Sequence, residues 1–112
     1  MIDAAIVVAL VLAEVAERVE RGAALLDEKE PGWAARIDVG KFDIGSGCRC
    51  ALGQLYGRFH DGLYEVFPSG EYQARSYGFM WEEGDEDGEP SEIAALNDEW
   101  RRVIAERLAG AA

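Results

Sequence analysis

The chain has 112 residues and a formal net charge of −11, because 22 aspartates and glutamates outnumber 11 lysines and arginines. This length allows one domain with its own core and is too short for two. The charge argues against direct binding to nucleic-acid phosphates or to an anionic membrane, since both require clustered lysine and arginine. Apolar residues make up 49% of the chain, which is typical of a globular protein and not of a disordered one.

The N-terminal segment predicts a long helix with an unusual first half. Residues 4–13 are all apolar, and no basic residue precedes Arg18, so the segment does not resemble a secretory signal. The run is also shorter than the ~20 residues that span a bilayer. We expect a soluble helix over residues 1–29, with a membrane-associated N-terminus as the lesser alternative. Because its first half is apolar on every face, we expect the rest of the chain or a second copy of the protein to bury it.

A connection follows this helix. Residues 30–32, Glu-Pro-Gly, predict the helix end, because proline disfavours helical geometry in the residue before it. Residues 33–47 combine apolar anchors with turn-forming aspartate and glycine, which favours an ordered connection. Its start, residues 33–37, is compatible with one helical turn. Residues 39–44 are compatible with either a loop or a short strand.

Three helical elements are predicted in the second half of the chain. A central helical segment over residues 48–67 has an apolar stripe at helical spacing, formed by Cys48, Leu52, Leu55 and Phe59. A short helix is expected over residues 69–77, followed by a glycine stop. A closing helix is expected over residues 91–110. Its predicted buried face consists of Ile93, Leu96, Trp100, Val103, Ile104 and Leu108.

Two glycines of the central segment suggest a close helix contact. Gly53 and Gly57 lie four residues apart, where the absence of side chains would let another backbone approach. The first helix offers a matching face of small residues that includes Ala9 and Ala13. We therefore expect these two pairs to pack together at the centre of the protein. The alternative is that Gly57 simply ends a short helix.

The acidic residues are concentrated in one expected loop, over residues 82–90. If the protein binds a partner through charge, this loop would face a basic protein, and reversing its charges should weaken the binding. The partner-binding candidates are therefore Glu82, Glu83, Asp85, Glu86, Asp87 and Glu89. The run also fits the first positions of a calcium-binding EF-hand loop. However, Ala94 occupies position 12, where a bidentate glutamate is required. A solvated acidic loop is the favoured interpretation.

Cys48, Cys50 and His60 are the candidates for a metal site. Zinc-binding cysteines are usually separated by two to four residues and accompanied by a second pair, which this chain lacks. On a helix, the two sulfurs would point about 200° apart, so both could bind a metal only if residues 48–50 form a loop. A redox pair activated by Arg49 is a second hypothesis. The alternative is that both cysteines pack as small apolar residues, which fits a reducing cytosol.

A succession of short motifs carries a resemblance. The segments RGAALLDEKEPGW at residues 21–33 and CRCALGQLYG at residues 48–57 resemble a group of small, functionally uncharacterised proteins of actinobacteria and their phages. The similarity continues more weakly through residues 77–79 and through Trp100-Arg101. It implies a bacterial or phage origin and a cytoplasmic location. It implies no catalytic residue, ligand or partner.

The sequence therefore predicts a mainly α-helical, single-domain bundle with long N- and C-terminal helices. We find no phosphate-binding loop, dinucleotide-binding glycine motif or HExxH zinc motif, so we predict no catalytic residue and no cofactor. The predicted function is a non-enzymatic interaction protein that binds another protein, with self-association as a further expectation. The alternatives are a zinc- or thiol-dependent protein that uses Cys48 and Cys50, and a structural homo-oligomer held together by the first helix.

Overall fold

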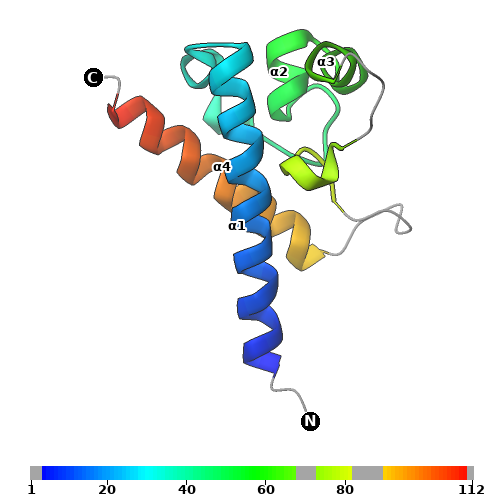
Figure 1. Cartoon of the computed structure of the whole chain (residues 1–112), viewed down its shortest axis with the longest axis vertical. Coiled ribbons are helices and arrows are strands. Elements are labelled where there is room, and N and C mark those ends of the chain that lie inside the picture. The colour runs from blue at the N-terminus through cyan, green and yellow to red at the C-terminus, as the bar shows by residue number, and fades with distance from the viewer. Residues whose placement is uncertain (1–3, 68–72, 82–89, 111–112) are drawn as a thin grey trace.

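The computed structural model describes residues 4–67, 73–81 and 90–110, with the backbone alone for residues 4–8, 11, 90 and 91. Four α-helices and three short 3-10 helices, labelled η, make up the described fold (Figure 1). In chain order they are α1 (Ala4–Lys29), η1 (Trp33–Arg36), η2 (Val39–Lys41), α2 (Ala51–Tyr56), α3 (Phe59–Val66), η3 (Arg75–Tyr77) and α4 (Pro90–Gly110). The mainly α-helical fold with long N- and C-terminal helices is confirmed, and no strand occurs in these ranges.

The predicted helical turn after Pro31 is present as η1, but the alternative of a short strand over residues 39–44 is wrong. Local hydrogen bonds satisfy this backbone instead. The Asp38 side chain accepts a hydrogen bond from the Gly40 N–H at 3.0 Å, and the Asp38 carbonyl accepts one from the Lys41 N–H at 3.1 Å. These bonds close the 3-10 turn η2. The backbone here is therefore hydrogen-bonded locally and not to a partner strand.

The core lies where the C-terminal half of α1 crosses α4 (Figure 1). In α1 the buried positions recur at helical spacing, at Val15, Val19, Ala23 and Leu26. The face of α4 predicted to be buried is confirmed at its centre, at Leu96, Trp100, Val103 and Ile104. Towards its ends, Ile93 is half-buried and Leu108 is exposed, because α4 extends past the helix that covers it.

The closest approach between elements lies between α1 and the turn at η3. A Cβ on Gly22 would overlap the carbonyl oxygen of Tyr77, and a Cβ on Gly78 would lie 2.9 Å from the Cα of Val19. Gly78 also has a φ of +74°, which side-chain-bearing residues rarely adopt. The indole N–H of Trp100 donates to the Gly78 carbonyl at 2.7 Å. Thus α1, η3 and α4 meet at one point that requires two glycines.

The predicted packing of Gly53 and Gly57 against the alanines of the first helix is wrong. Ala9 and Ala13 are exposed. A Cβ on Gly53 would overlap the carbonyl oxygen of Gly47, so Gly53 instead packs against the loop before its own helix. Gly57 has a φ of +94° and ends α2, which is the alternative interpretation. The central segment is therefore two helices, α2 and α3, and residues 48–50 form a turn before them.

Substitution of Gly22 tests the contact between α1 and η3. In an exposed helix, replacing glycine by alanine stabilises by about 1 kcal/mol. Here the methyl group would collide with the Tyr77 backbone, so we expect Gly22→Ala to lower the free energy of unfolding by about 1–3 kcal/mol. Chemical denaturation measures this change. Gly110→Ala is the control, because Gly110 has open space around it; an equal gain in stability from both substitutions would contradict the contact.

An ion pair joins the ends of the two long helices. Asp27 of α1 accepts hydrogen bonds from Arg107 of α4 at 2.9 and 2.8 Å, and from the indole N–H of Trp33 at 2.8 Å. The hydrogen bonds from Arg107 lower the pKa of the Asp27 carboxyl. Partial burial raises this pKa, and the single hydrogen bond from Trp33 lowers it. The ionised form is therefore stabilised in the folded protein.

Because the folded-state pKa of Asp27 is lowered, its contribution to stability is present above the unfolded-state pKa of about 4 and is lost as the pH falls through the folded-state value. We expect Asp27→Asn to reduce the free energy of unfolding near pH 7 by less than about 1 kcal/mol, since the pair is partly exposed. The difference from the wild type should shrink as the pH falls below the unfolded-state pKa of about 4 and disappear below the lowered folded-state pKa. Denaturation curves at several pH values test this, with the exposed Asp98→Asn as control; a difference independent of pH would contradict it.

Candidate functional site

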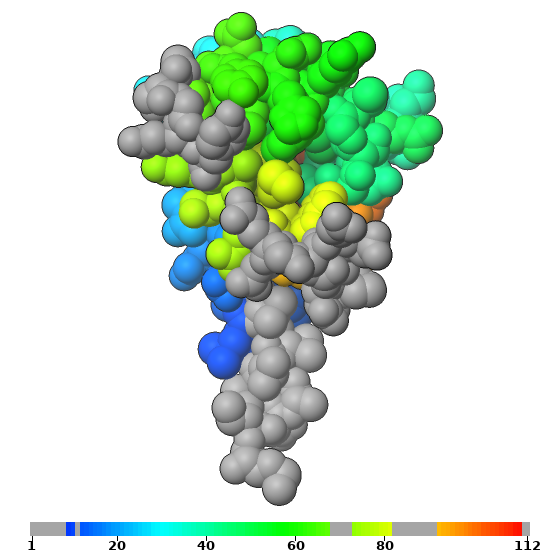
Figure 2. Space-filling view, turned by 90° about the vertical axis from the view of Figure 1, so that its right-hand side faces the viewer, coloured from blue at the N-terminus to red at the C-terminus, as the bar shows by residue number. Residues whose placement is uncertain are grey.

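A pocket of about 310 Å³ opens between the turn before α2, the start of α3 and the segment after η3. We call it the Cys48 pocket. Its lining residues are Ile44, Gly45, Ser46, Gly47, Cys48, Cys50, Arg58, Phe59, His60, Phe79, Met80 and Trp81. Figure 2 shows residues 79–81, in yellow, lying below the green helices α2 and α3 on this face of the molecule. Three segments that are distant in sequence therefore build one hollow.

Hydrogen bonds donated by backbone N–H groups hold one wall of the pocket, over residues 44–50. The Asp43 carboxylate accepts from the Gly45 N–H at 2.9 Å, and the Ser46 carbonyl accepts from the Cys50 N–H at 3.1 Å. The Gly47 carbonyl accepts from the N–H of Phe59, the first residue of α3, at 2.8 Å. This last bond ties the wall directly to the helix that supplies Phe59 and His60.

The same wall is anchored to α4 at its other end. The Ile44 N–H donates to the Asn97 side chain at 2.7 Å, and Arg101 donates to the Phe42 carbonyl at 2.8 Å. Gln54 adds a clamp from α2, because its side chain donates to the carbonyl of Arg49 at 2.9 Å. The polar residues that fix this wall thus come from two helices.

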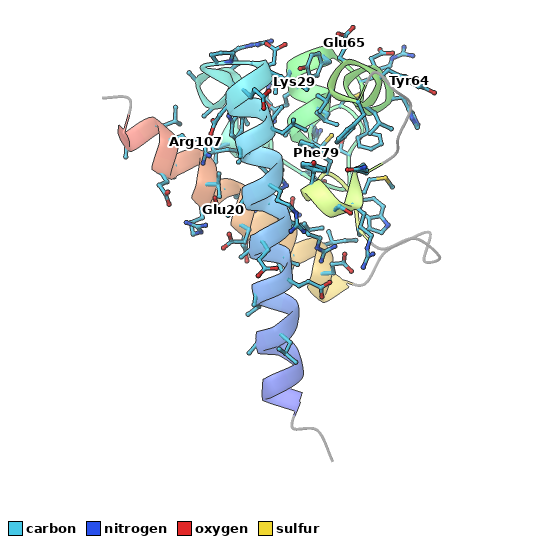
Figure 3. The ribbon with its side chains drawn as sticks, in the orientation of Figure 1. Glu20, Lys29, Tyr64, Glu65, Phe79 and Arg107 are labelled. Carbon is cyan, nitrogen blue, oxygen red and sulfur yellow. The ribbon has the colours of Figure 1, made fainter. Side chains whose placement is uncertain are left out.

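Phe79 forms the base of the pocket. Its ring stacks on Trp100 at a centroid distance of 5.5 Å, and its side chain is buried. Figure 3 shows it between α1 and the α2–α3 pair. Met80 and Trp81, the next two residues, are half-buried and also line a neighbouring hollow of about 290 Å³. The base is therefore part of the rigid core, whereas the rim is accessible to solvent.

The three metal candidates all line the Cys48 pocket, but they are in different environments. Cys48 and His60 are exposed. Cys50 is buried and caps α2, with its sulfur accepting a hydrogen bond from the Gly53 N–H at 3.3 Å. Burial raises the pKa of the Cys50 thiol. Within the described ranges, no group of three or more histidine, cysteine, aspartate or glutamate side chains is placed to hold a metal ion.

The charges around the pocket contrast with those of the whole chain. Arg58 and His60 line it, and no described aspartate or glutamate does. The guanidinium of Arg58 is exposed and forms no hydrogen bond or ion pair with any residue that the structure describes, while the Arg58 carbonyl accepts from the Gly62 N–H at 3.0 Å. By comparison, Arg36 is paired with Glu30 at 2.9 Å. The pocket thus combines apolar walls with an unpaired cation at its rim.

A second surface is the N-terminal part of α1, residues 4–14, which we call the apolar arm. In Figure 1 it extends beyond the crossing with α4. Leu10 is 64% exposed and Leu12 is 49% exposed, and Ala9 and Ala13 are also exposed. The expectation that the rest of the chain buries this segment is therefore wrong. No helix in the described part of the chain is both long and apolar enough to cross a membrane.

The partner-binding candidates of the acidic loop, over residues 82–89, lie outside the described residues. Glu92, at the end of the acidic run, is described and is buried in the first turn of α4. It forms an ion pair with Arg18 of α1 at 3.1 Å. Glu92 therefore joins the two long helices and is not part of a solvated acidic surface.

Comparisons of the chain with models of known families, with curated proteins and with solved structures found no match. The resemblance to small actinobacterial and phage proteins thus stays a prediction.

Sequence patterns indicated part of the pocket. The cysteines and His60 were singled out by their chemistry. Arg58 was missed because nothing in the sequence distinguishes an unpaired arginine from a paired one. Its position beside a helix-ending glycine was the available signal for a surface turn.

The two thiols provide a direct test of this geometry. We expect Cys48 to react with 5,5′-dithiobis(2-nitrobenzoate) in the folded protein at least about tenfold faster than Cys50, because Cys50 is buried and its pKa is raised. The variants Cys48→Ser and Cys50→Ser assign each kinetic phase, and unfolding in guanidinium should make the two rates similar. Equal rates in the folded protein would contradict the buried position of Cys50.

Proposed function

We propose that this protein is a non-enzymatic, cytoplasmic interaction protein that associates with other protein chains through the apolar arm, and that a second copy is its first partner. The exposure of Leu10 and Leu12 carries this proposal. In a helix these residues point about 200° apart, so the arm presents apolar side chains on opposite faces. Such an exposed apolar segment is typical of a protein–protein contact.

The neighbourhood of the arm favours a protein surface over an anionic membrane. Glu14, the last residue of the arm, and Glu17, one turn further along α1, are exposed, and the whole chain has a net charge of −11. Anionic lipids would therefore repel it. A second arm, by contrast, offers a matching apolar helix that includes small alanines, and these allow two helices to approach closely.

The size of the arm sets the expected strength of association. Residues 4–14 form a helix about 16 Å long. Two such segments bury less than the ~1,200–2,000 Å² of a stable, specific interface. We therefore expect association in the micromolar range or weaker, with the fraction of dimer rising with protein concentration.

Sedimentation velocity at several concentrations tests the role of the arm. We expect the weight-average mass of the wild type to rise above the monomer mass, and the double variant Leu10→Gln, Leu12→Gln to stay monomeric. Both leucines are exposed, so their replacement should change the stability of the monomer by less than about 0.5 kcal/mol.

The matched control is Ala24→Gln, an exposed position on the C-terminal half of the same helix. It should associate as the wild type does. A monomeric wild type at every concentration, or association that persists in the double leucine variant, would contradict the proposal.

A further inference from the structure

We propose that the Cys48 pocket binds a small molecule that combines a flat apolar body with one carboxylate, and that Arg58 receives this carboxylate. This inference is independent of the apolar arm, which lies on α1 and supplies no residue to the pocket.

The volume of the pocket limits the size of the ligand. Small-molecule sites usually measure about 300–1,000 Å³, and this pocket of about 310 Å³ is at the lower end. A single or fused aromatic ring fits this volume, and the mouth of the pocket is open to solvent.

The walls of the pocket determine the chemistry of the ligand body. Phe59, Phe79 and Trp81 supply three aromatic rings, and Ile44 and Met80 supply aliphatic and thioether surface. Aromatic rings favour a flat partner in stacked or edge-on contact. Phe79 cannot move easily to fill the space, because it is stacked on Trp100 in the core. The hollow is therefore largely preformed.

The charges at the rim determine the polar group of the ligand. Among the described residues that line the pocket, Arg58 is the charged one; the acidic residues 82–89, which follow Trp81, lie outside the described residues. Two described acids adjoin lining residues: Asp43, which accepts a hydrogen bond from the Gly45 N–H at 2.9 Å, and Asp61, which follows His60 in the first turn of α3. Arg58 retains its full set of donors for a ligand, and a guanidinium matches a carboxylate with two parallel hydrogen bonds. His60 adds a further polar group at the same rim.

A matched pair of probes tests the carboxylate. We would titrate the full-length protein with 1-naphthylacetate and with its uncharged isostere 1-naphthylacetamide, using isothermal titration calorimetry. We expect the carboxylate to bind at least about tenfold more tightly than the amide, since a hydrogen bond to a charged partner contributes about that factor. Absence of binding by 1-naphthylacetate, or equal affinity for the two probes, would overturn the proposal.

A matched pair of variants tests Arg58. Arg58→Gln should abolish the preference for the carboxylate while leaving binding of the amide unchanged. Arg49→Gln is the control, because Arg49 is also exposed but lies in the turn before α2 and is not among the residues that line the pocket. It should retain the full preference. A preference that survives Arg58→Gln, or that is lost equally in both variants, would contradict the role of Arg58.

The exposed thiol reports where the probe binds. Cys48 lines the pocket, so saturating 1-naphthylacetate should slow its alkylation by iodoacetamide at least about threefold, as the rim becomes covered. Unchanged alkylation in the presence of bound probe would place the binding site elsewhere and overturn the assignment of the pocket.

Discussion

The contact between Gly22 of α1 and the backbone at Tyr77-Gly78 determines how the described elements are assembled. It lets η3 lie directly against α1, and the Gly78 carbonyl then faces the indole N–H of Trp100 in α4. Because a buried carbonyl without a partner costs about 1–3 kcal/mol, the hydrogen bond and the close backbone approach depend on each other. The order of the elements around the core follows from this one point.

Trp100, which is bonded to Gly78, also packs against the rest of the core and against the base of the pocket. The centroid of its ring lies 5.9 Å from that of Trp33, 6.2 Å from that of Phe42 and 5.5 Å from that of Phe79. One side chain therefore joins η1, the connection before α2 and the base of the pocket. A fully buried tryptophan of this kind contributes about 3–5 kcal/mol. The surface ion pairs, such as Arg102 with Glu20 at 3.0 Å, contribute less than about 1 kcal/mol each. Packing around Trp100 therefore dominates the stability, and the surface charges make smaller adjustments.

The buried pair of Arg18 and Glu92 has a different role. Its side chains are only 6% and 11% exposed, and the Nε of Arg18 has no hydrogen-bond partner. The desolvation of two charges offsets much of their attraction, so the pair adds little net stability. Removing one partner would nevertheless leave a buried charge, which costs about 3–5 kcal/mol. This penalty favours the crossing of α1 and α4 in which Arg18, just after the end of the apolar arm, faces Glu92.

Local patterns in the sequence were sufficient for the two long helices, but they did not separate α2 from α3 and did not predict the contacts between helices. Helical periodicity predicted both long helices, and Pro31-Gly32 predicted the end of the first. These signals depend only on residues that are close in sequence. The glycine contact was assigned to Gly53 and Gly57, whereas the structure places it at Gly22 and Gly78. Spacing within one helix cannot show which distant backbone lies against it.

The pocket was only partly predictable for the same reason. Its walls come from residues 44–50, 58–60 and 79–81, and no pattern within one segment shows that the other two lie beside it. The apolar sequence of the arm left two alternatives open, burial by the rest of the chain or by a second copy, and its exposure contradicts the first. An apolar sequence shows that a segment needs a partner, but it does not show whether the same chain supplies one.

Hydrogen exchange of the three tryptophan indole protons, measured by NMR, tests most directly whether the fold depends on the Trp100 contact. Trp100 donates to a buried carbonyl at the junction, whereas Trp81 is half-buried at the pocket rim. We predict that the Trp100 proton exchanges slowest of the three and only through global unfolding, with the same denaturant dependence as the whole protein. Exchange of this proton through a local opening that leaves α1 and α4 folded would contradict the account.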